Sequence, residues 1–174
     1  MARALAAVLA VGLAMAAGCG RRVNAIELAK DWLMRTCTVG ERAGLDDEIR
    51  ANAAVIELLF IDAFTKGPSD DERREVIQSV EHVWTLMQLQ VAEPEVYNLS
   101  QAEIDAMKSI SLSEEKTWEL ELFEYNYRAA ALAGLGITGG PAGKNLLAST
   151  AADSDSPFNS VATEALASNA SRQR

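Results

Sequence analysis

The fold is decided by residues 127–167, which read YRAAALAGLGITGGPAGKNLLASTAADSDSPFNSVATEALA. An apolar pattern in this stretch repeats after 31 residues. Each copy has the spacing of one buried helical face. The first copy consists of Tyr127, Ala130, Ala131, Gly134 and Leu135, and the second of Phe158, Val161, Ala162, Ala165 and Leu166. Internal periods of about 20–50 residues are typical of stacked helical units, so the stretch predicts helix pairs rather than a globule around one catalytic pocket.

The chain as a whole has the composition of an all-α protein. It has 174 residues, of which 49% are hydrophobic, and strand signals are scarce. This length is enough for one good core. We therefore expect antiparallel helix hairpins packed into one compact domain. The formal net charge is −9 and Lys and Arg are not clustered, which argues against DNA or RNA as a partner.

The N-terminus has the features of a signal peptide. A short positive segment with Arg3 precedes an uncharged apolar run of 13 residues, 4–16. This run is shorter than the roughly 20 residues needed to span a bilayer, and it has the length of a signal-peptide apolar region. Such a segment is either a lipoprotein signal, an ordinary secretory signal or a short uncleaved anchor, and all three stay open at this point.

The apolar run ends in Ala16-Ala17-Gly18-Cys19, which resembles the lipobox of bacterial lipoproteins, with Ala16 in place of the preferred Leu. The resemblance implies cleavage before Cys19, a diacylglycerol thioether on Cys19, and acylation of the new N-terminus, as with palmitate. Several acyl chains would hold the protein on a membrane almost permanently. Gly20 rather than Asp follows Cys19, so the resemblance implies the outer membrane of a bacterial cell envelope, facing the periplasm.

These observations predict four segments. We expect a signal peptide over 1–18, a tether over 19–23, a helical HEAT-like domain over 24–168 and a disordered tail over 169–174. With Cys19 lipidated, Cys37 has no intramolecular partner, and we expect it to pack as a small hydrophobic residue on a first helix, 24–38.

Local signals place the next helices. We expect one over 46–65 and one over 69–93, joined by the turn Lys66-Gly67-Pro68 into an antiparallel hairpin. Capping boxes begin helices at Ser69 and Ser100, each with Glu three residues later. His82, the only histidine, lies on a polar face, and a lone exposed histidine is a poor metal ligand set. We therefore expect no metal site and no catalytic residue.

The longest helix is expected over 114–135. It carries two apolar lines, so we expect it to be central and to pack on both sides. One line is Trp118, Leu122, Tyr125, Ala129 and Leu132, and the other is Leu120, Phe123, Tyr127 and Ala131. An acidic stripe lies between them: Glu114, Glu121 and Glu124. Paired carboxylates perform acid–base chemistry only in a water-poor cleft, so we interpret this stripe as a solvated face and a candidate contact for a partner.

Residues 127–136 resemble the inner helix of the short HEAT-like repeats of phycobilin lyases and bacterial scaffold proteins. The resemblance continues through Gly140-Pro141 and the acidic turn 153–155 to the second copy, 158–167. It implies α-solenoid packing near the C-terminus. The second copy has Phe158-Asn159 where these repeats usually have an aliphatic residue and Arg.

The same region contains two apparent nucleotide motifs. Gly134, Gly136 and Gly139 spell a dinucleotide fingerprint, and Gly143-Lys144 has the last residues of a phosphate loop. The fingerprint must follow a strand and open a helix, whereas here a long helix precedes it. The phosphate loop requires Gly at 138 and Ser or Thr at 145, and this chain has Thr and Asn. We therefore expect a turn between helices, with Pro141 starting the second, and no cofactor.

The function that we expect is non-catalytic. Helical repeats present long surfaces for other proteins, so the sequence predicts a membrane-anchored scaffold or adaptor, held by lipid on Cys19, that binds a protein partner. Two alternatives stay open. One is an envelope enzyme or small-molecule-binding protein with a pocket between helices lined by Trp84, Trp118 and Tyr125, and the other is a purely structural lipoprotein.

Overall fold

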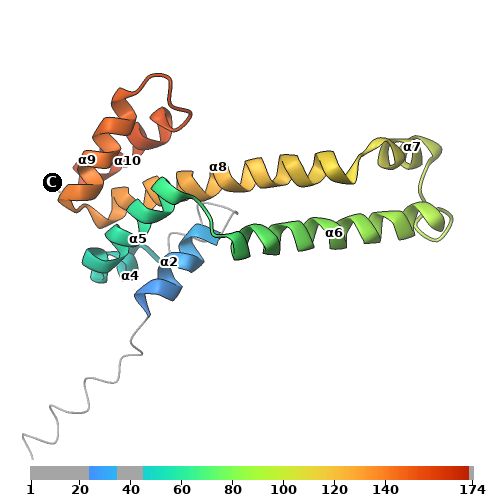
Figure 1. Ribbon diagram of the computed structural model, residues 1–174, viewed down its shortest axis with the longest axis horizontal. Coiled ribbons are helices and arrows are strands. Elements are labelled where there is room, and N and C mark those ends of the chain that lie inside the picture. The colour runs from blue at the N-terminus through green and yellow to red at the C-terminus, as the bar shows by residue number, and fades with distance from the viewer. Residues whose placement is uncertain (1–23, 35–44, 173–174) are drawn as a thin grey trace, which may run out of the picture.

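The computed structural model describes residues 24–34 and 45–172 (Figure 1). Within these ranges it contains eight helices and no strand, which confirms the all-α prediction. The helices are α2 (Ala25–Met34), α4 (Asp46–Ala51), α5 (Ala53–Lys66), α6 (Asp70–Ala92), α7 (Gln101–Ser109), α8 (Leu112–Thr138), α9 (Pro141–Ala152) and α10 (Asn159–Arg172).

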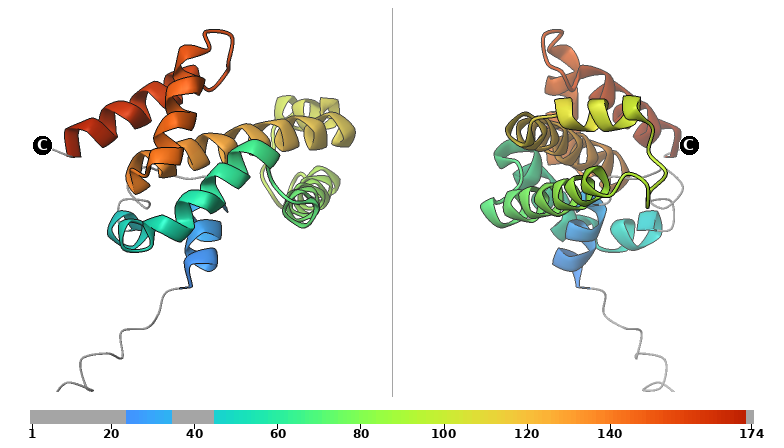
Figure 2. Two further views of the ribbon diagram at one scale, coloured as in Figure 1. Left: turned by 60° about the vertical axis from the view of Figure 1, so that its left-hand side comes forward. Right: turned by 90° about the vertical axis from the view of Figure 1, so that its right-hand side faces the viewer.

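The described chain forms a body and a projecting arm (Figures 1 and 2). In the arm, residues 70–125, helix α6 and the first half of α8 run antiparallel, and α7 lies at the far tip. In the body, α2, α4, α5, α9 and α10 pack around the second half of α8. Helix α8 contacts all five of these helices and also α6, which confirms that it is central.

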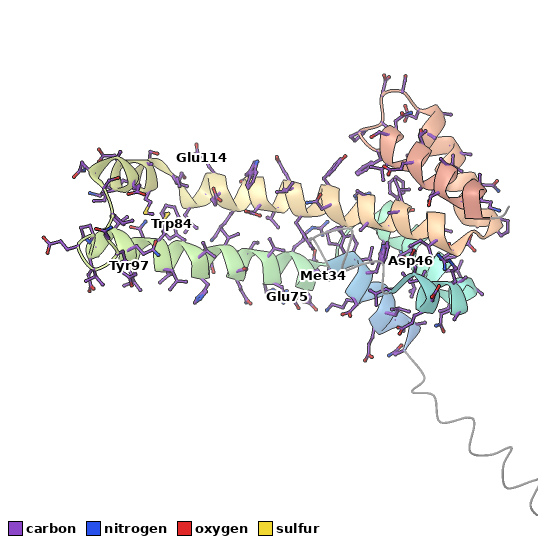
Figure 3. All side chains as sticks on the ribbon, turned by 180° about the vertical axis from the view of Figure 1, so that it is seen from behind. Met34, Asp46, Glu75, Trp84, Tyr97 and Glu114 are labelled. Carbon is purple, nitrogen blue, oxygen red and sulfur yellow. The ribbon has the colours of Figure 1, made fainter. Side chains whose placement is uncertain are left out.

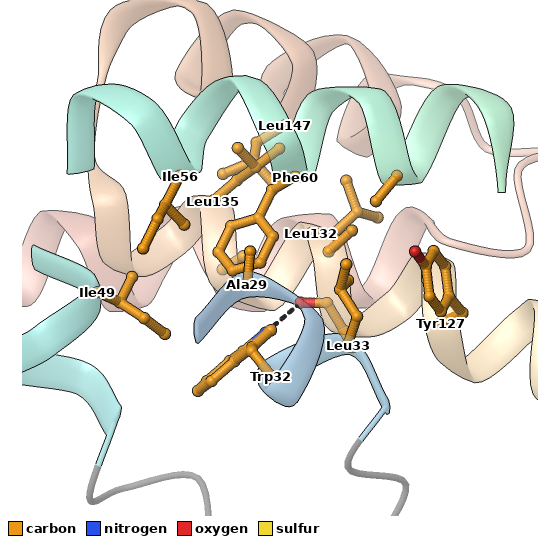
Figure 4. Close-up of a cluster of buried hydrophobic side chains, with 14 of the residues drawn as sticks. Ala29, Trp32, Leu33, Ile49, Ile56, Phe60, Tyr127, Leu132, Leu135 and Leu147 are labelled. Carbon is orange, nitrogen blue, oxygen red and sulfur yellow. Dashed lines mark hydrogen bonds between the residues drawn. The ribbon is translucent and has the colours of Figure 1, made fainter. Parts of the chain in front are cut away.

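The core lies where α2, α4, α5 and α9 meet the second half of α8 (Figure 4). The largest fully buried side chains are Phe60, Ile49, Ile56, Leu132, Leu135 and Leu147. Each such side chain stabilises the fold by about 1.5–3 kcal/mol relative to its exposed state. Trp32 of α2 adds a directed contact, because its indole Nε1 donates a hydrogen bond of 2.7 Å to the Ala130 carbonyl of α8.

The prediction that the expected helices 46–65 and 69–93 form an antiparallel hairpin is wrong. The chain between 46 and 66 is divided at Asn52 into α4 and α5, and α6 pairs with α8 instead of folding back on α5. Two contacts explain this arrangement. The guanidinium of Arg128 on α8 donates to the carbonyls of Phe64 and Thr65, which fixes the end of α5 on α8. Gly67 then turns the chain with a φ of +76°, and α6 continues away from the body.

Most helix boundaries agree with the local signals. Both capping boxes are present, at Ser69 with Glu72 and at Ser100 with Glu103. Gly139 ends α8 in the left-handed conformation, and Pro141 is the first residue of α9. The expected tail starts too early, because α10 continues to Arg172 and the buried Asn169 donates to the Gly136 carbonyl. Cys37 lies outside the described residues.

Candidate functional site

The arm is a two-helix structure with little interior. Among its residues only Glu72, Ile104 and Phe123 are buried. Ion pairs tie α6 to α8 at two levels, since Arg73 Nε lies 2.8 Å from Glu124 Oε1 and Lys116 Nζ contacts Glu81. Trp84 lies between the two helices (Figure 3). Because α7 packs on α6 only at the tip and none of the other described helices covers the arm, α6 and α8 leave apolar side chains exposed along it.

One face of α8, which we call the outer stripe, changes from buried to exposed along the helix. Residues four and three positions apart share a helix face. Leu132 is fully buried, whereas the exposed fraction is 39% at Tyr125, 38% at Leu122 and 56% at Trp118. The outer stripe consists of Trp118, Leu122, Tyr125, Ala129, Leu132 and Gly136.

Helix α10 and the turn before it cover the body half of this stripe. Gly136 lies so close to α10 that a Cβ added to it would be 2.8 Å from the carbonyl oxygen of Ala165. The ring of Tyr125 stacks on Phe158, with a centroid distance of 5.1 Å and an interplanar angle of 16°. Beyond Tyr125 the stripe continues along the arm without cover from the described residues. The prediction of a helix that packs on two sides therefore holds for only half of its length.

The arm also carries the acidic excess of the chain. Residues 70–125 contain 14 Asp and Glu against four Lys and Arg, a net charge of −10. The rest of the chain has 11 acidic and 12 basic residues, a net charge of +1. The negative charge of the protein is therefore concentrated on its projecting part, and a field of this kind attracts positively charged groups.

The three predicted contact residues do not have equal roles. Glu114 and Glu121 are exposed on α8, and their carboxylates bond to none of the described residues. Glu124 instead accepts the hydrogen bond from Arg73 and helps to hold the arm together. This contact raises the pKa of Arg73 above its ordinary value. Glu114 and Glu121 stay available for a partner, and Glu124 is a structural residue of the arm.

The three aromatic residues suggested for a pocket are not brought together. Trp84 lines a recess of about 90 Å³ with Val80, Val83, Met87, Ile110, Glu115 and Glu119. Trp118 and Tyr125 lie on the outer stripe of α8 and do not line this recess. A volume this small holds a few atoms, well below the size of ligand pockets, which is about 300–1,000 Å³.

A larger groove of about 430 Å³ lies at the base of the arm, between α2, the end of α5 and the start of α6. Its apolar wall includes Ala29, Leu33, Leu59 and Ala63, and Lys30, Asp62, Lys66, Ser69, Glu72 and Tyr127 provide polar groups. The Tyr127 hydroxyl donates to Glu72 Oε1 at 3.3 Å, and Glu72 also accepts from Ser69. These groups join the arm to the body. Ser69 Oγ also donates to Glu72 Oε2 at 2.7 Å, as part of the capping box that begins α6.

Tyr127 makes the stability of this junction sensitive to alkaline pH. Burial, and then the nearby Glu72 carboxylate, raise the pKa of the Tyr127 phenol above its ordinary value near 10. The folded state therefore favours the neutral phenol, and this contribution to stability is present below pH 10 and is lost as the pH rises further. We expect Tyr127→Phe to cost about 0.5–1.5 kcal/mol at neutral pH and to flatten the decline of unfolding free energy above pH 10. Urea unfolding across pH 8–11 measures both effects, and parallel curves for the two proteins would contradict this expectation.

The glycine-rich turn between α8 and α9 binds the carboxylate of Glu57. In a nucleotide-binding site, the amides of such a turn bind a phosphate instead. Glu57 of α5 is 9% exposed, and its Oε1 accepts a hydrogen bond of 2.6 Å from the Gly143 amide in the first turn of α9. A Cβ added at Gly140 would lie 1.9 Å from Glu57 Oε2. The sequence identified the turn but gave no indication of Glu57, because the contact joins residues 86 positions apart.

Within the described ranges no three His, Cys, Asp or Glu side chains are grouped closely enough to hold a metal ion. None of the helices described has the length and apolar character required to cross a membrane. His82 is exposed on α6. Cys19 lies outside the described residues, so its lipidation stays a prediction.

Comparison with known protein families, with curated proteins and with solved structures found no match to this chain.

Proposed function

We propose that the protein is a non-catalytic adaptor that is anchored to a bacterial membrane by lipid on Cys19 and binds a protein partner through its arm. One observation carries this proposal. Of the twelve large apolar side chains that are exposed among the described residues, nine belong to the arm. They are Val83, Leu86, Leu89, Val96, Tyr97, Ile110, Trp118, Leu122 and Tyr125. Apolar surface gathered on one projecting element is typical of a protein-binding site.

The body fits the role of a rigid support for the arm. The first copy of the 31-residue pattern lies on α8, and the second begins at Phe158, just before α10, and continues on α10, which packs against α8. In the first copy all five residues are buried, and in the second Ala162 and Ala165 are buried. This arrangement supports a HEAT-like origin of the C-terminal helices. Two copies are too few for a stable solenoid, so we propose that α2, α4 and α5 complete the core.

The anchor is tested separately from the arm. We expect the full-length protein to fractionate with membranes when it is expressed in a bacterium that processes lipoproteins, and Cys19→Ser to appear in the soluble periplasmic fraction. Metabolic labelling with an alkyne fatty acid provides a direct measurement of the acyl chains. Absence of the label from the full-length protein would exclude lipidation as the anchor, whatever the arm binds.

The role of the arm is tested by site-specific photo-crosslinking in the native membrane. A photoreactive residue is placed at Val83, Tyr97 or Trp118 on the arm, and at Val55 or Leu58 as controls, since both are exposed on the body. We expect a discrete crosslinked product of the same partner from the arm positions only. Products of equal intensity from the body, or none from any arm position, would contradict the proposal.

A further inference from the structure

We infer that the uncovered half of the outer stripe of α8 binds a basic amphipathic helix of a partner protein. This inference rests on the proposed adaptor function and names the surface and the chemistry of the partner. The surface consists of Trp118 and Leu122, with the partly exposed Tyr125 at the edge where Phe158 stacks on it, and of four carboxylates around them: Glu114, Glu115, Glu119 and Glu121.

The first argument is continuity with a helix–helix contact that already exists. In the body, α10 lies on the outer stripe at Gly136, and the turn before it stacks Phe158 on Tyr125. The apolar spacing of four and three residues does not end there but continues to Trp118. The face that binds one helix inside the molecule therefore offers the same kind of packing over residues 118–125, or about 12 Å of helix. An amphipathic helix in such a position is a common mode of peptide recognition.

The second argument is charge. On a helical wheel Glu114 and Glu121 lie on one side of Trp118 and Leu122, and Glu115 and Glu119 lie on the other. None of these four carboxylates bonds to a described residue, whereas Glu124 pairs with Arg73 and Glu81 with Lys116. Apolar positions flanked on both sides by free acidic groups match a helix with a central apolar stripe and Lys or Arg beside it, as in the flanking positions of coiled coils.

The same charges exclude two other occupants of this face. A second copy of the chain would bring two arms together, each with a net charge of −10, and like charges placed opposite one another cost several kcal/mol. Anionic lipid headgroups would be repelled in the same way. A basic helix is attracted instead, and the field of the arm should also increase its association rate, with a strong dependence on salt.

A defined peptide tests the inference on the full-length protein in detergent. The probe is a fluorescent helical peptide of about five turns, with Leu at the core heptad positions and Lys beside them, and fluorescence anisotropy gives its Kd. Its controls are a scrambled peptide of the same composition and a version with Glu in place of Lys. We expect only the basic amphipathic peptide to bind. We also expect Trp118→Gln and Leu122→Gln to weaken it at least about tenfold, whereas Val55→Gln, at an exposed position on α5 in the body, leaves the Kd unchanged.

Charge reversal provides the decisive comparison. The double variant Glu114→Lys with Glu121→Lys should no longer bind the basic peptide and should bind the peptide with Glu in place of Lys. Glu93→Lys with Glu95→Lys, which makes the same charge change elsewhere on the arm, should keep the original preference. Equal loss in both double variants, or equal binding of the scrambled peptide, would overturn the inference, because attraction would then depend on charge alone.

Self-association provides the remaining outcome. Sedimentation that shows a dimer lost in Leu122→Gln would also overturn the inference, because a second copy would then occupy the stripe. If the peptide fails to bind while arm positions still crosslink to a partner, the surface is wrong and the adaptor function stands. If the peptide does not bind and no arm position crosslinks to a partner, both the inference about the surface and the proposed adaptor function are wrong.

Discussion

Replacing Gly134 by alanine is expected to lower the free energy of unfolding by about 1–3 kcal/mol. The sign is unusual, because Gly→Ala in a helix interior ordinarily stabilises by about 1 kcal/mol. Position 134 is in the middle of α8, and a Cβ there would lie 2.2 Å from the Phe60 ring, which is itself fully buried. Neither partner can move without disturbing the closely packed core, so steric overlap outweighs the gain in helix propensity.

A double-mutant cycle with Phe60→Leu identifies the cause. Phe60→Leu alone leaves space beside Gly134 and should be destabilising, but Gly134→Ala added to it should cost much less than in the wild type, because the added methyl group then enters that space. Urea unfolding of the four proteins gives the coupling energy. Additive effects of the two substitutions would mean that the overlap with Phe60 is not what constrains position 134.

The sequence predicted those parts of the fold that depend on neighbouring residues. The capping boxes at Ser69 and Ser100 located two helix starts, since each box satisfies amide groups within four residues of itself. Gly139 and Pro141 marked the turn between α8 and α9 for similar local reasons. The two apolar lines of α8 predicted that it is central, and this holds for the half of the helix in the body, where Leu132 of one line and Tyr127 and Ala131 of the other are buried.

The parts that the sequence did not predict depend on contacts between distant residues. The short turn after α5 suggested that α6 returns along it, but Arg128 holds the end of α5, while Arg73 and Glu124 join α6 to α8. Both contacts span more than 50 residues. The candidate site was predicted in part for the same reason. The sequence predicted that Glu114 and Glu121 lie on an exposed face, and both are exposed. It did not predict that the described helices leave Trp118 uncovered, because this depends on where α10 packs on α8.

Apolar residues stabilise the fold of the body, whereas many apolar residues of the arm contribute little to its stability. In the body, apolar residues are buried by several helices and define one arrangement. In the arm, many apolar residues stay exposed on both α6 and α8, although polar residues at those positions would be better for the isolated protein in water. Surface of this kind contributes little to folding, and it is the observation on which the proposed adaptor function rests.

Removing the Glu57 carboxylate is expected to destabilise the protein by about 1–3 kcal/mol, because a buried donor loses its partner. Helix α9 starts with Gly140-Pro141-Ala142-Gly143, and no side chain of this segment caps it. Glu57 of α5 supplies the missing acceptor to the Gly143 amide at 2.6 Å, and its charge interacts favourably with the positive end of the helix. In Glu57→Leu the buried amide has no replacement acceptor, whereas Glu57→Gln keeps an oxygen and loses only the charge. We therefore expect the order wild type, Gln variant, Leu variant in thermal and urea unfolding.

Hydrogen exchange distinguishes this mechanism from a general loss of packing. The Gly143 amide should exchange faster in Glu57→Leu by a larger factor than amides in α2 or α4, because its own bond has been removed. Glu95→Leu, at an exposed position in the turn of the arm, is the matched control and should change stability by no more than about 0.5 kcal/mol. Equal stability of the Leu and Gln variants would mean that packing of the side chain, and not its oxygen atoms, holds α9 against α5. A Gly143 amide that exchanges at the wild-type rate in Glu57→Leu would mean that another group caps the helix.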